Sequence, residues 1–389
     1  MKRKIIALLT AIFLTLPLLA GCARNEAADV HVFYYTYSDP YISTVRSALD
    51  RSLDAAGIKY QDHDSNNSQT TQTEQVQTAI TKGAKLLVVN IVTTGSDDAA
   101  NGIVNLAKNA GIPVIFFNRE VSDGVVSSYD KCAFIGTDAT EAGKLQGDMI
   151  GDYVVKNYDK IDLNKDGKIS YVLFMGEKGN NEAIYRTRYS VENANKKLKE
   201  AGKSELVFYD KSNNDKYLLD RDGKWSASAA NDYMNTLLSS YNASNNNMVE
   251  LVICNNDGMA EGAISALAGA GYNTGSEGAG TIPVFGVDAT SAAKELISAG
   301  KMAGTIKQDA DGMAEAIAKV VKNGLDAGKG ILDGMEGYNI DSGVRKVRIA
   351  YAVYLGEEKA VREDTAKENT DSGMGEGIIG DIADKMTDN

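Results

Sequence analysis

The sequence predicts an α/β protein built from two domains, each with a doubly wound parallel sheet. The chain has 389 residues, 43% of them hydrophobic, and this length fits two hydrophobic cores better than one. Apolar runs of strand length alternate with segments of helical spacing, which favours parallel strands joined by right-handed crossovers. The alternation runs to Phe117 and begins again at Thr140. We therefore expect two consecutive α/β domains, with a ligand in the crevice beyond the carboxyl ends of the strands.

Residues 1–22 have the features of a signal peptide. Basic residues at positions 2–4 precede an apolar run over residues 5–19, which is short for a membrane span. The small residues directly before Cys22 resemble a lipobox, in which the cysteine receives a diacylglycerol. An ordinary signal peptide with a chance cysteine is the alternative. We expect export, lipidation of Cys22, and a short polar tether over residues 23–29.

The first alternating series begins at Val30. Gly57 directly follows the first predicted helix, and Gly111 lies two residues after the third, where a residue of left-handed conformation commonly ends a helix. The predicted strands are 30–35, 58–62, 86–92 and 113–117, and the predicted helices are 41–56, 70–81 and 97–109.

The second series reaches to Tyr354 and is followed by a stretch of different composition. Residues 357–389 are acidic, polar and rich in glycine, which is typical of a disordered tail. The predicted strands are 170–175, 206–209, 251–254, 282–287 and 344–354, and the predicted helices are 140–155, 182–199, 226–241, 258–270, 292–299 and 310–323.

The composition argues against several classes of function. The net charge is −12, which is unfavourable for a nucleic-acid partner. The two histidines, His31 and His63, both lie near the start, so histidine-rich zinc sites and a Ser/His/Asp triad have little support. Cys132 and Cys254 lie in or beside apolar runs. Export would permit a disulfide between them, but buried free thiols are the favoured interpretation.

Polar side chains follow several of the predicted strands. Asp39 comes after the first strand, Asn118 after the fourth, and Asn256 and Asp288 after two strands of the second series. Such planar groups can donate or accept paired hydrogen bonds, as adjacent sugar hydroxyls require, and aromatic side chains offer flat faces to a pyranose. The alternative for each single residue is a helix N-cap. Capping does not explain why both domains supply such groups on the crevice side.

In these motifs the chain resembles the galactose/glucose-binding proteins of the periplasmic binding protein superfamily. The resemblance covers about residues 30–356. It rests on six motifs: Tyr-Thr-Tyr-Ser-Asp-Pro-Tyr at 35–41, Phe-Phe-Asn-Arg-Glu at 116–120, Gly-Thr-Asp at 136–138, Asp-Leu-Asn-Lys-Asp-Gly at 162–167, Asn-Asp at 256–257 and Ile-Pro-Val-Phe-Gly-Val-Asp at 282–288.

The resemblance implies two lobes joined by three crossing segments that close on one hexose. The first lobe would comprise 30–136 and 309–343, and the second 137–308 and 344–356. Asp39 would bind near the O4 of the sugar, and Arg119 stands where the family has a lysine. The implied ligand-binding residues are Asp39, Tyr41, Asn118, Asn180, Glu182, Arg186, Trp225, Asn256, Asp288 and Gln308, with Tyr41 and Trp225 as stacking rings.

Three of these positions depart from the family pattern. Asn180 replaces a histidine, Glu182 an aspartate and Gln308 an asparagine. All three keep hydrogen-bonding groups, and two of them are one methylene longer, which bears on the fine specificity for one hexose over another. The segment before Trp225 also carries an insertion.

Residues 162–170 have the spacing of a calcium-binding loop. Asp162, Asn164 and Asp166 provide oxygens at positions 1, 3 and 5, the backbone of Lys168 takes position 7, and Ser170 takes position 9. The alternative is a solvated turn, because position 12 is not a glutamate. The family resemblance implies that Glu250 supplies the missing carboxylate, and that Ca²⁺ has a structural role.

Two functional classes follow. One is a lipid-anchored binding protein outside the cytoplasm, at the outer face of the membrane or in the periplasm. It would act as a monomer that captures galactose or glucose and presents it to an ABC permease. The other is an exported glycoside hydrolase that uses Asp39, Glu182 and Asp288 as catalytic carboxylates. The carboxylates are already needed for hydroxyl recognition, so we favour binding without catalysis. A transcriptional regulator of the same fold is disfavoured by the signal peptide and the acidic charge.

Overall fold

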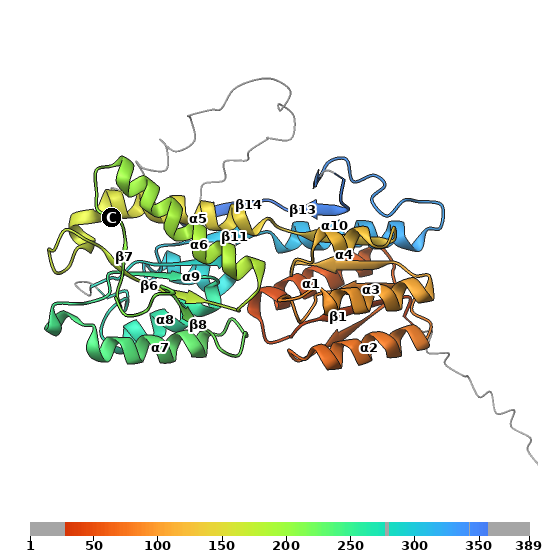
Figure 1. The fold of residues 1–389 in the computed structure, drawn as a ribbon, viewed down its shortest axis with the longest axis horizontal. Coiled ribbons are helices and arrows are strands. Elements are labelled where there is room, and N and C mark those ends of the chain that lie inside the picture. The colour runs from red at the N-terminus through yellow and green to blue at the C-terminus, as the bar shows by residue number, and fades with distance from the viewer. Residues whose placement is uncertain (1–27, 277–279, 342, 357–389) are drawn as a thin grey trace, which may run out of the picture.

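The computed structural model describes residues 28–276, 280–341 and 343–356. They form two lobes side by side along the long axis of the molecule, each built on a seven-stranded sheet (Figure 1). The predicted fold class, two doubly wound parallel-sheet domains, is confirmed. The predicted signal peptide with Cys22, most of the predicted tether and the predicted tail lie outside the described residues.

The first sheet has the strand order β12-β13-β5-β4-β3-β1-β2, and only β12 runs antiparallel to its neighbour. The order reverses between β1 and β3, which is where doubly wound sheets bind ligands at their carboxyl edge. Its strands are β1 (Val30–Tyr34), β2 (Tyr60–Asp64), β3 (Leu86–Val89), β4 (Val114–Phe117), β5 (Cys132–Gly136), β12 (Asn339–Ile340) and β13 (Lys346–Arg348).

The second sheet repeats this plan with the order β14-β11-β10-β9-β6-β7, and β8 also pairs with β6. The order reverses between β6 and β9, and β14 is the antiparallel edge strand. Its strands are β6 (Ser170–Met175), β7 (Val207–Phe208), β8 (Leu218–Leu219), β9 (Leu251–Cys254), β10 (Val284–Asp288), β11 (Gly304–Gln308) and β14 (Tyr351–Tyr354).

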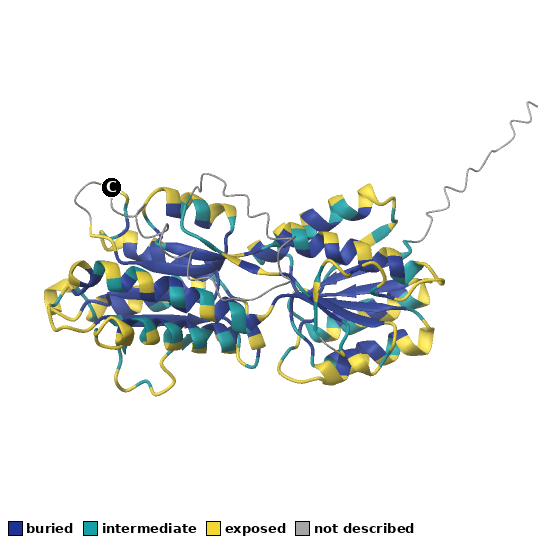
Figure 2. Ribbon diagram, turned by 90° about the horizontal axis from the view of Figure 1, so that it is seen from above, coloured by how far each residue is buried: buried dark blue, intermediate teal, exposed yellow. Residues whose placement is uncertain are grey.

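Helices cover both faces of each sheet, and the apolar side chains beneath them form the cores (Figure 2). In the first lobe, α1 (Pro40–Ala55) and α10 (Ala310–Leu325) cover one face, and α2 (Gln69–Thr81), α3 (Asp98–Ala110) and α4 (Asp123–Ser127) cover the other. In the second lobe, α5 (Ala139–Ile161) and α6 (Asn181–Glu200) lie opposite α7 (Ala227–Ser240), α8 (Asp257–Gly269) and α9 (Ser291–Ser298). A 3-10 turn at Ala243–Asn245 follows α7.

The chain passes between the lobes three times. It crosses between β5 and α5, between β11 and α10, and between β13 and β14. The third crossing corrects the expected boundary, which placed residues 344–356 in the second lobe and predicted one strand over 344–354. Lys346–Arg348 pair with β5 of the first sheet, and only Tyr351–Tyr354 pair with β11 of the second. A strand-like run alone does not distinguish one strand from two, because the edges of both sheets accept such residues.

The helices α5 and α6 approach closely because glycines recur every four residues along α5. A Cβ at Gly143 would lie 2.5 Å from the carbonyl oxygen of Tyr185, and one at Gly147 would lie 2.6 Å from the Cβ of Asn193. This contact fixes the position of α6 against α5. The first turns of α6 carry Glu182 and Arg186, which line the cavity described below.

Cys132 and Cys254 are both buried and free, in different lobes, which confirms the interpretation as free thiols. Within the described ranges, none of the helices combines the length and hydropathy that crossing a membrane requires.

Candidate functional site

A cavity lies between the two lobes, with about 360 Å³ of open space including its mouth. All ten residues that the sequence predicts as ligand-binding residues line it. The lining residues are Tyr35, Asp39, Tyr41, Ile42, Asn118, Arg119, Asn180, Glu182, Arg186, Trp225, Asn256, Asp288 and Gln308. Their roles toward a ligand stay a prediction, but the folded chain brings every one of them to one place.

The carboxylate of Asp39 caps α1 and also faces the cavity. Its Oδ1 accepts a hydrogen bond from the Ile42 backbone N–H at 2.9 Å, and its Oδ2 accepts one from the Tyr35 hydroxyl at 2.6 Å. Pro40 occupies the first helical turn, where its missing N–H costs nothing. The capping interpretation and the binding interpretation of Asp39 are therefore compatible.

Two asparagines of the second lobe combine the same two tasks. Asn180 caps α6 by accepting from the Glu182 and Ala183 N–H groups, and Asn256 caps α8 by accepting from the Met259 N–H at 2.9 Å. In both asparagines Oδ1 accepts the capping hydrogen bonds. The Nδ2 group of Asn180 donates to Glu177, and that of Asn256 donates to the carbonyl oxygen of Trp225. Capping thus fixes the side chains at the edge of the cavity.

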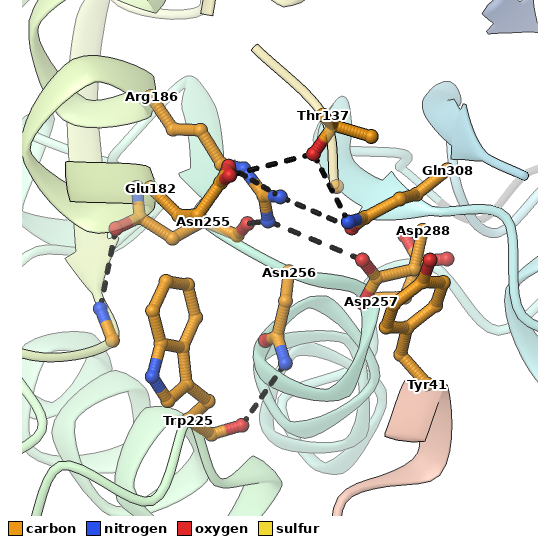
Figure 3. Close-up of polar contacts among 12 residues, drawn as sticks. Tyr41, Thr137, Glu182, Arg186, Trp225, Asn255, Asn256, Asp257, Asp288 and Gln308 are labelled. Carbon is orange, nitrogen blue, oxygen red and sulfur yellow. Dashed lines mark hydrogen bonds and ion pairs between the residues drawn. The ribbon is translucent and has the colours of Figure 1, made fainter. Parts of the chain in front are cut away.

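Arg186 is the centre of a buried polar cluster (Figure 3). Its side chain is 4% exposed, and its guanidinium lies 2.9 Å from Glu182 Oε2 and 4.0 Å from Asp288 Oδ1. It also donates to the carbonyl oxygen of Asn255 at 2.9 Å and to Gln308 Oε1 at 3.1 Å. Burial opposes the positive charge, but Tyr351 and the two carboxylates outweigh burial and raise the pKa of Arg186.

Asp288 ends β10 in a conformation that non-glycine residues rarely adopt, with φ of 129°. Burial raises its pKa, and the nearby Arg186 opposes that shift. Behind it, Asp257 accepts from the Thr305 hydroxyl at 2.6 Å and from the Thr290 N–H at 2.8 Å. Burial raises the pKa of Asp257 to about 7. These contacts hold the backbone that carries Asp288 at the cavity wall.

Trp225 lies flat against the backbone of Gly176. A Cβ at Gly176 would lie 2.1 Å from the indole Cδ2, so only glycine permits this contact. Trp225 is 7% exposed and has a left-handed φ of 54°. Tyr41 enters from α1 of the first lobe (Figure 3). Aromatic residues from both lobes therefore line the cavity, Tyr35 and Tyr41 from the first and Trp225 from the second.

The carboxylates of the cavity are tied to partners. Glu182 accepts from Arg186 and from the Tyr351 hydroxyl at 3.1 Å, Asp39 caps a helix, and Asp288 lies beside Arg186. This arrangement suits the fixed recognition of hydroxyl groups.

Several residues of the site escape sequence reasoning. Tyr351 joins the Arg186 cluster from β14, near the carboxyl end of the fold, and Thr137 contacts its hydroxyl at 2.8 Å from the first crossing segment. Glu177 lies beneath Asn180 and Trp225. The strand-end run after β6 contains Glu177, but no local pattern distinguishes it from its neighbours.

The predicted calcium loop lies between α5 and β6, and Glu250 packs against it. Glu250 Oε1 accepts from the Leu163 N–H at 2.7 Å, and its Oε2 accepts from the Ser170 N–H at 2.8 Å. Asp162 accepts from the N–H groups of Asp166 and Gly167. The Glu250 carboxylate therefore joins both ends of the loop. Among the described residues, however, no three His, Cys, Asp or Glu side chains lie close enough together to form a metal site on their own.

Comparison with known families decides the class of this chain. A family model described as a periplasmic binding protein domain matches residues 30–330. This chain belongs to that family. The family location is outside the cytoplasm, and this chain is a binding protein rather than an enzyme, as are the relatives described below.

The curated relatives of this binding protein include carbohydrate carriers. It is 36% identical over 336 residues to the D-galactose/methyl-galactoside binding periplasmic protein MglB of Haemophilus influenzae, covering 86% of this chain and 92% of the relative. It is 24% identical over 306 residues to the ribose import binding protein RbsB of Escherichia coli, covering 79% and 87%.

Solved structures of the same fold hold small polyols and sugars. An ABC transporter solute binding protein from Bacillus halodurans, solved with myo-inositol, has a TM-score of 0.61 and 25% identity, covering 85% of this chain and 96% of its own. One from Clostridium phytofermentans, solved with β-D-glucose, has a TM-score of 0.64 and 22% identity, covering 84% and 93%. At that identity the second likeness supports the fold alone.

Proposed function

We propose that this binding protein captures an aldohexose, D-galactose or D-glucose, in the cavity between its lobes and delivers it to an ABC importer. The observation that carries the proposal is the lining of the cavity by planar polar groups and aromatic rings from both lobes. Its similarity to the MglB protein favours galactose among the candidates.

The chemistry of the lining matches a pyranose ring. Asp39 and Asn118 from the first lobe, and Asn256, Asp288 and Arg186 from the second, offer paired donors and acceptors for adjacent hydroxyls. Tyr41 and Trp225 offer apolar faces for the C–H surfaces of the ring. Since both lobes contribute, a bound sugar has more contacts when the lobes are closed, and its differential affinity stabilises the closed state.

Titration calorimetry of the mature protein with galactose, glucose, ribose, xylose and myo-inositol tests the proposal. We expect a hexose to bind with a Kd below about 100 μM and more tightly than the pentoses or the inositol. Asp39→Ala and Asn256→Ala should each weaken binding at least ~10-fold, about 1.4 kcal/mol.

A matched control separates binding from capping, because Asp39 and Asn256 do both. Ser68 caps α2 by accepting from the Thr71 N–H and is not among the residues lining the cavity. Ser68→Ala should lower stability by about 1 kcal/mol and leave hexose affinity unchanged. A wild-type protein that binds no hexose below 100 μM, or variants that bind as tightly as Ser68→Ala, would contradict the proposal.

The lipid anchor belongs to the same proposal. A diacylglyceryl group on Cys22 would hold the carrier beside a membrane permease, and the lipobox-like sequence supports it. Cys22→Ser is expected to move the protein from the membrane fraction to the soluble fraction. Unchanged membrane association of that variant would count against the anchor.

We further propose a structural calcium ion at the loop 162–170. Asp162, Asn164, Asp166 and Ser170 with the Lys168 carbonyl would hold it, joined by Glu250. When bound, Ca²⁺ would link the loop to the strand that follows Glu250. The contacts of Glu250 with both ends of the loop support this assignment.

Thermal unfolding tests the calcium proposal. Calcium is expected to raise the unfolding temperature and a chelator to lower it, since a ligand that binds only the native state stabilises it. Asp162→Ala should remove that difference, whereas Asp152→Ala, an exposed carboxylate on α5 paired with Lys197, should retain it. The assignment fails if the Asp162 variant still responds to calcium as the wild type does.

A further inference from the structure

The carboxylate of Glu177 contacts the opposite lobe. Glu177 follows β6 of the second lobe, and its Oε2 lies 2.6 Å from Nη2 of Arg119, which follows β4 of the first lobe. Its Oε1 accepts a hydrogen bond from the hydroxyl of Thr94, also of the first lobe, at 3.4 Å. One side chain thus joins the two halves across the cleft.

The same carboxylate orients two side chains of the cavity wall. Glu177 Oε2 accepts from Nδ2 of Asn180 at 3.1 Å and from the indole Nε1 of Trp225 at 3.4 Å. Glu177 itself is not among the residues that line the cavity. It therefore acts through its neighbours rather than on a ligand directly.

Contacts within the first lobe fix the position of the Arg119 side chain. Its guanidinium donates to the carbonyl oxygen of Val92 at 2.8 Å and lies 4.2 Å from the ring centre of Tyr35. The Arg119 and Glu177 side chains are 5% and 17% exposed. Solvent therefore screens this ion pair much less than an exposed one.

We propose that Glu177 is a positioning residue that couples closure of the lobes to the shape of the cavity. Opening the cleft would separate Glu177 from Arg119, so their attraction favours the closed state whichever sugar is bound. The inference deepens the proposed sugar-binding function and rests on it for its main readout. Such a contact raises the affinity for every ligand by a similar factor, because it shifts the population of the closed state.

The test compares Glu177→Gln with Glu192→Gln. Glu192 also pairs with an arginine at 2.8 Å, but both partners, Glu192 and Arg188, lie on α6 and are more than half exposed. We expect Glu177→Gln to raise the Kd of each hexose that the wild type binds by ~10-fold or more, by the same factor for each, and mainly through faster dissociation. Glu192→Gln should stay within about twofold of the wild type.

A double-mutant cycle with Arg119→Gln shows whether the ion pair carries the effect. The double variant should bind about as tightly as the weaker single variant, since one contact is removed in both. Equal affinity of Glu177→Gln and wild type would overturn the proposal, as would additive losses or a loss confined to one hexose. Glu177→Asp, which keeps the charge but shortens the reach, provides the same comparison if the glutamine variant does not fold.

Small-angle scattering of the sugar-free proteins separates this inference from the proposed function. If the wild type binds no hexose, the proposed function fails. The effect of Glu177 on lobe closure is then tested by the radius of gyration alone. A larger radius of gyration for Glu177→Gln than for the wild type and Glu192→Gln would support it. Equal radii would refute it.

Discussion

Replacing Arg186 by methionine is expected to abolish measurable hexose binding and to lower the free energy of unfolding by about 3–5 kcal/mol. The substitution keeps an unbranched apolar stem but removes the guanidinium, which leaves Glu182 and Asp288 buried without their counter-charge. An uncompensated buried carboxylate is strongly destabilising, and here two share one cation. Urea unfolding and titration calorimetry measure the two effects.

The neighbouring arginine of the same helix supplies the control. Arg188 pairs with Glu192 on the exposed side of α6, and exposed pairs of this kind contribute about 0.3–0.5 kcal/mol. Arg188→Met should therefore bind hexose normally and unfold almost as the wild type does. A stable Arg186→Met variant that still binds sugar would show that the buried cluster is not needed for either property.

Replacing Gly176 by alanine is expected to weaken hexose binding by at least ~10-fold while leaving the fold intact. The new Cβ would fall 2.1 Å from the Trp225 ring, which must then move off the backbone and toward the cavity. The indole would also shift from Glu177, its hydrogen-bond acceptor at 3.4 Å. Displacing a stacking ring by even a fraction of an ångström costs its contact with the ligand.

Fluorescence of Trp225, the single tryptophan, reports its displacement directly. Gly102→Ala serves as the control, because Gly102 lies within α3 and a Cβ there would meet nothing within 4 Å. That change should leave binding and emission unaltered and stabilise the helix slightly. An unshifted emission spectrum together with wild-type affinity in Gly176→Ala would exclude the proposed packing of Trp225.

Local signals in the sequence foresee part of the candidate site, and the family resemblance supplies the rest. Asp39, Asn180 and Asn256 stand between a strand and a helix, and such positions demand a capping residue. In a parallel sheet these positions also meet at one edge. The same local chemistry that starts a helix therefore places these residues at the cleft, which is why they can be found without the tertiary structure.

Other contacts of the site depend on segments far apart in the chain. Tyr351 reaches Arg186 only because β14 joins the edge of the second sheet beside β11. The first part of the run 344–354 is basic and the second part is apolar, but both can form strands, and this difference does not show that the run divides between two sheets. Which strand pairs with which edge is decided by the packing of the whole lobe.

By itself, the sequence determines two α/β domains, because these follow from hydrophobic periodicity. Its motifs, by their resemblance to known binding proteins, indicate the family and the residues of the cleft. Only the tertiary structure decides the third crossing between Arg348 and Tyr351, the Arg186 cluster and the pairing of Glu177 with Arg119. Each of these depends on side chains from separate segments meeting in a buried place. A buried charged side chain needs a partner of opposite charge or a hydrogen-bonding group, and only the folded chain brings that partner into contact with it.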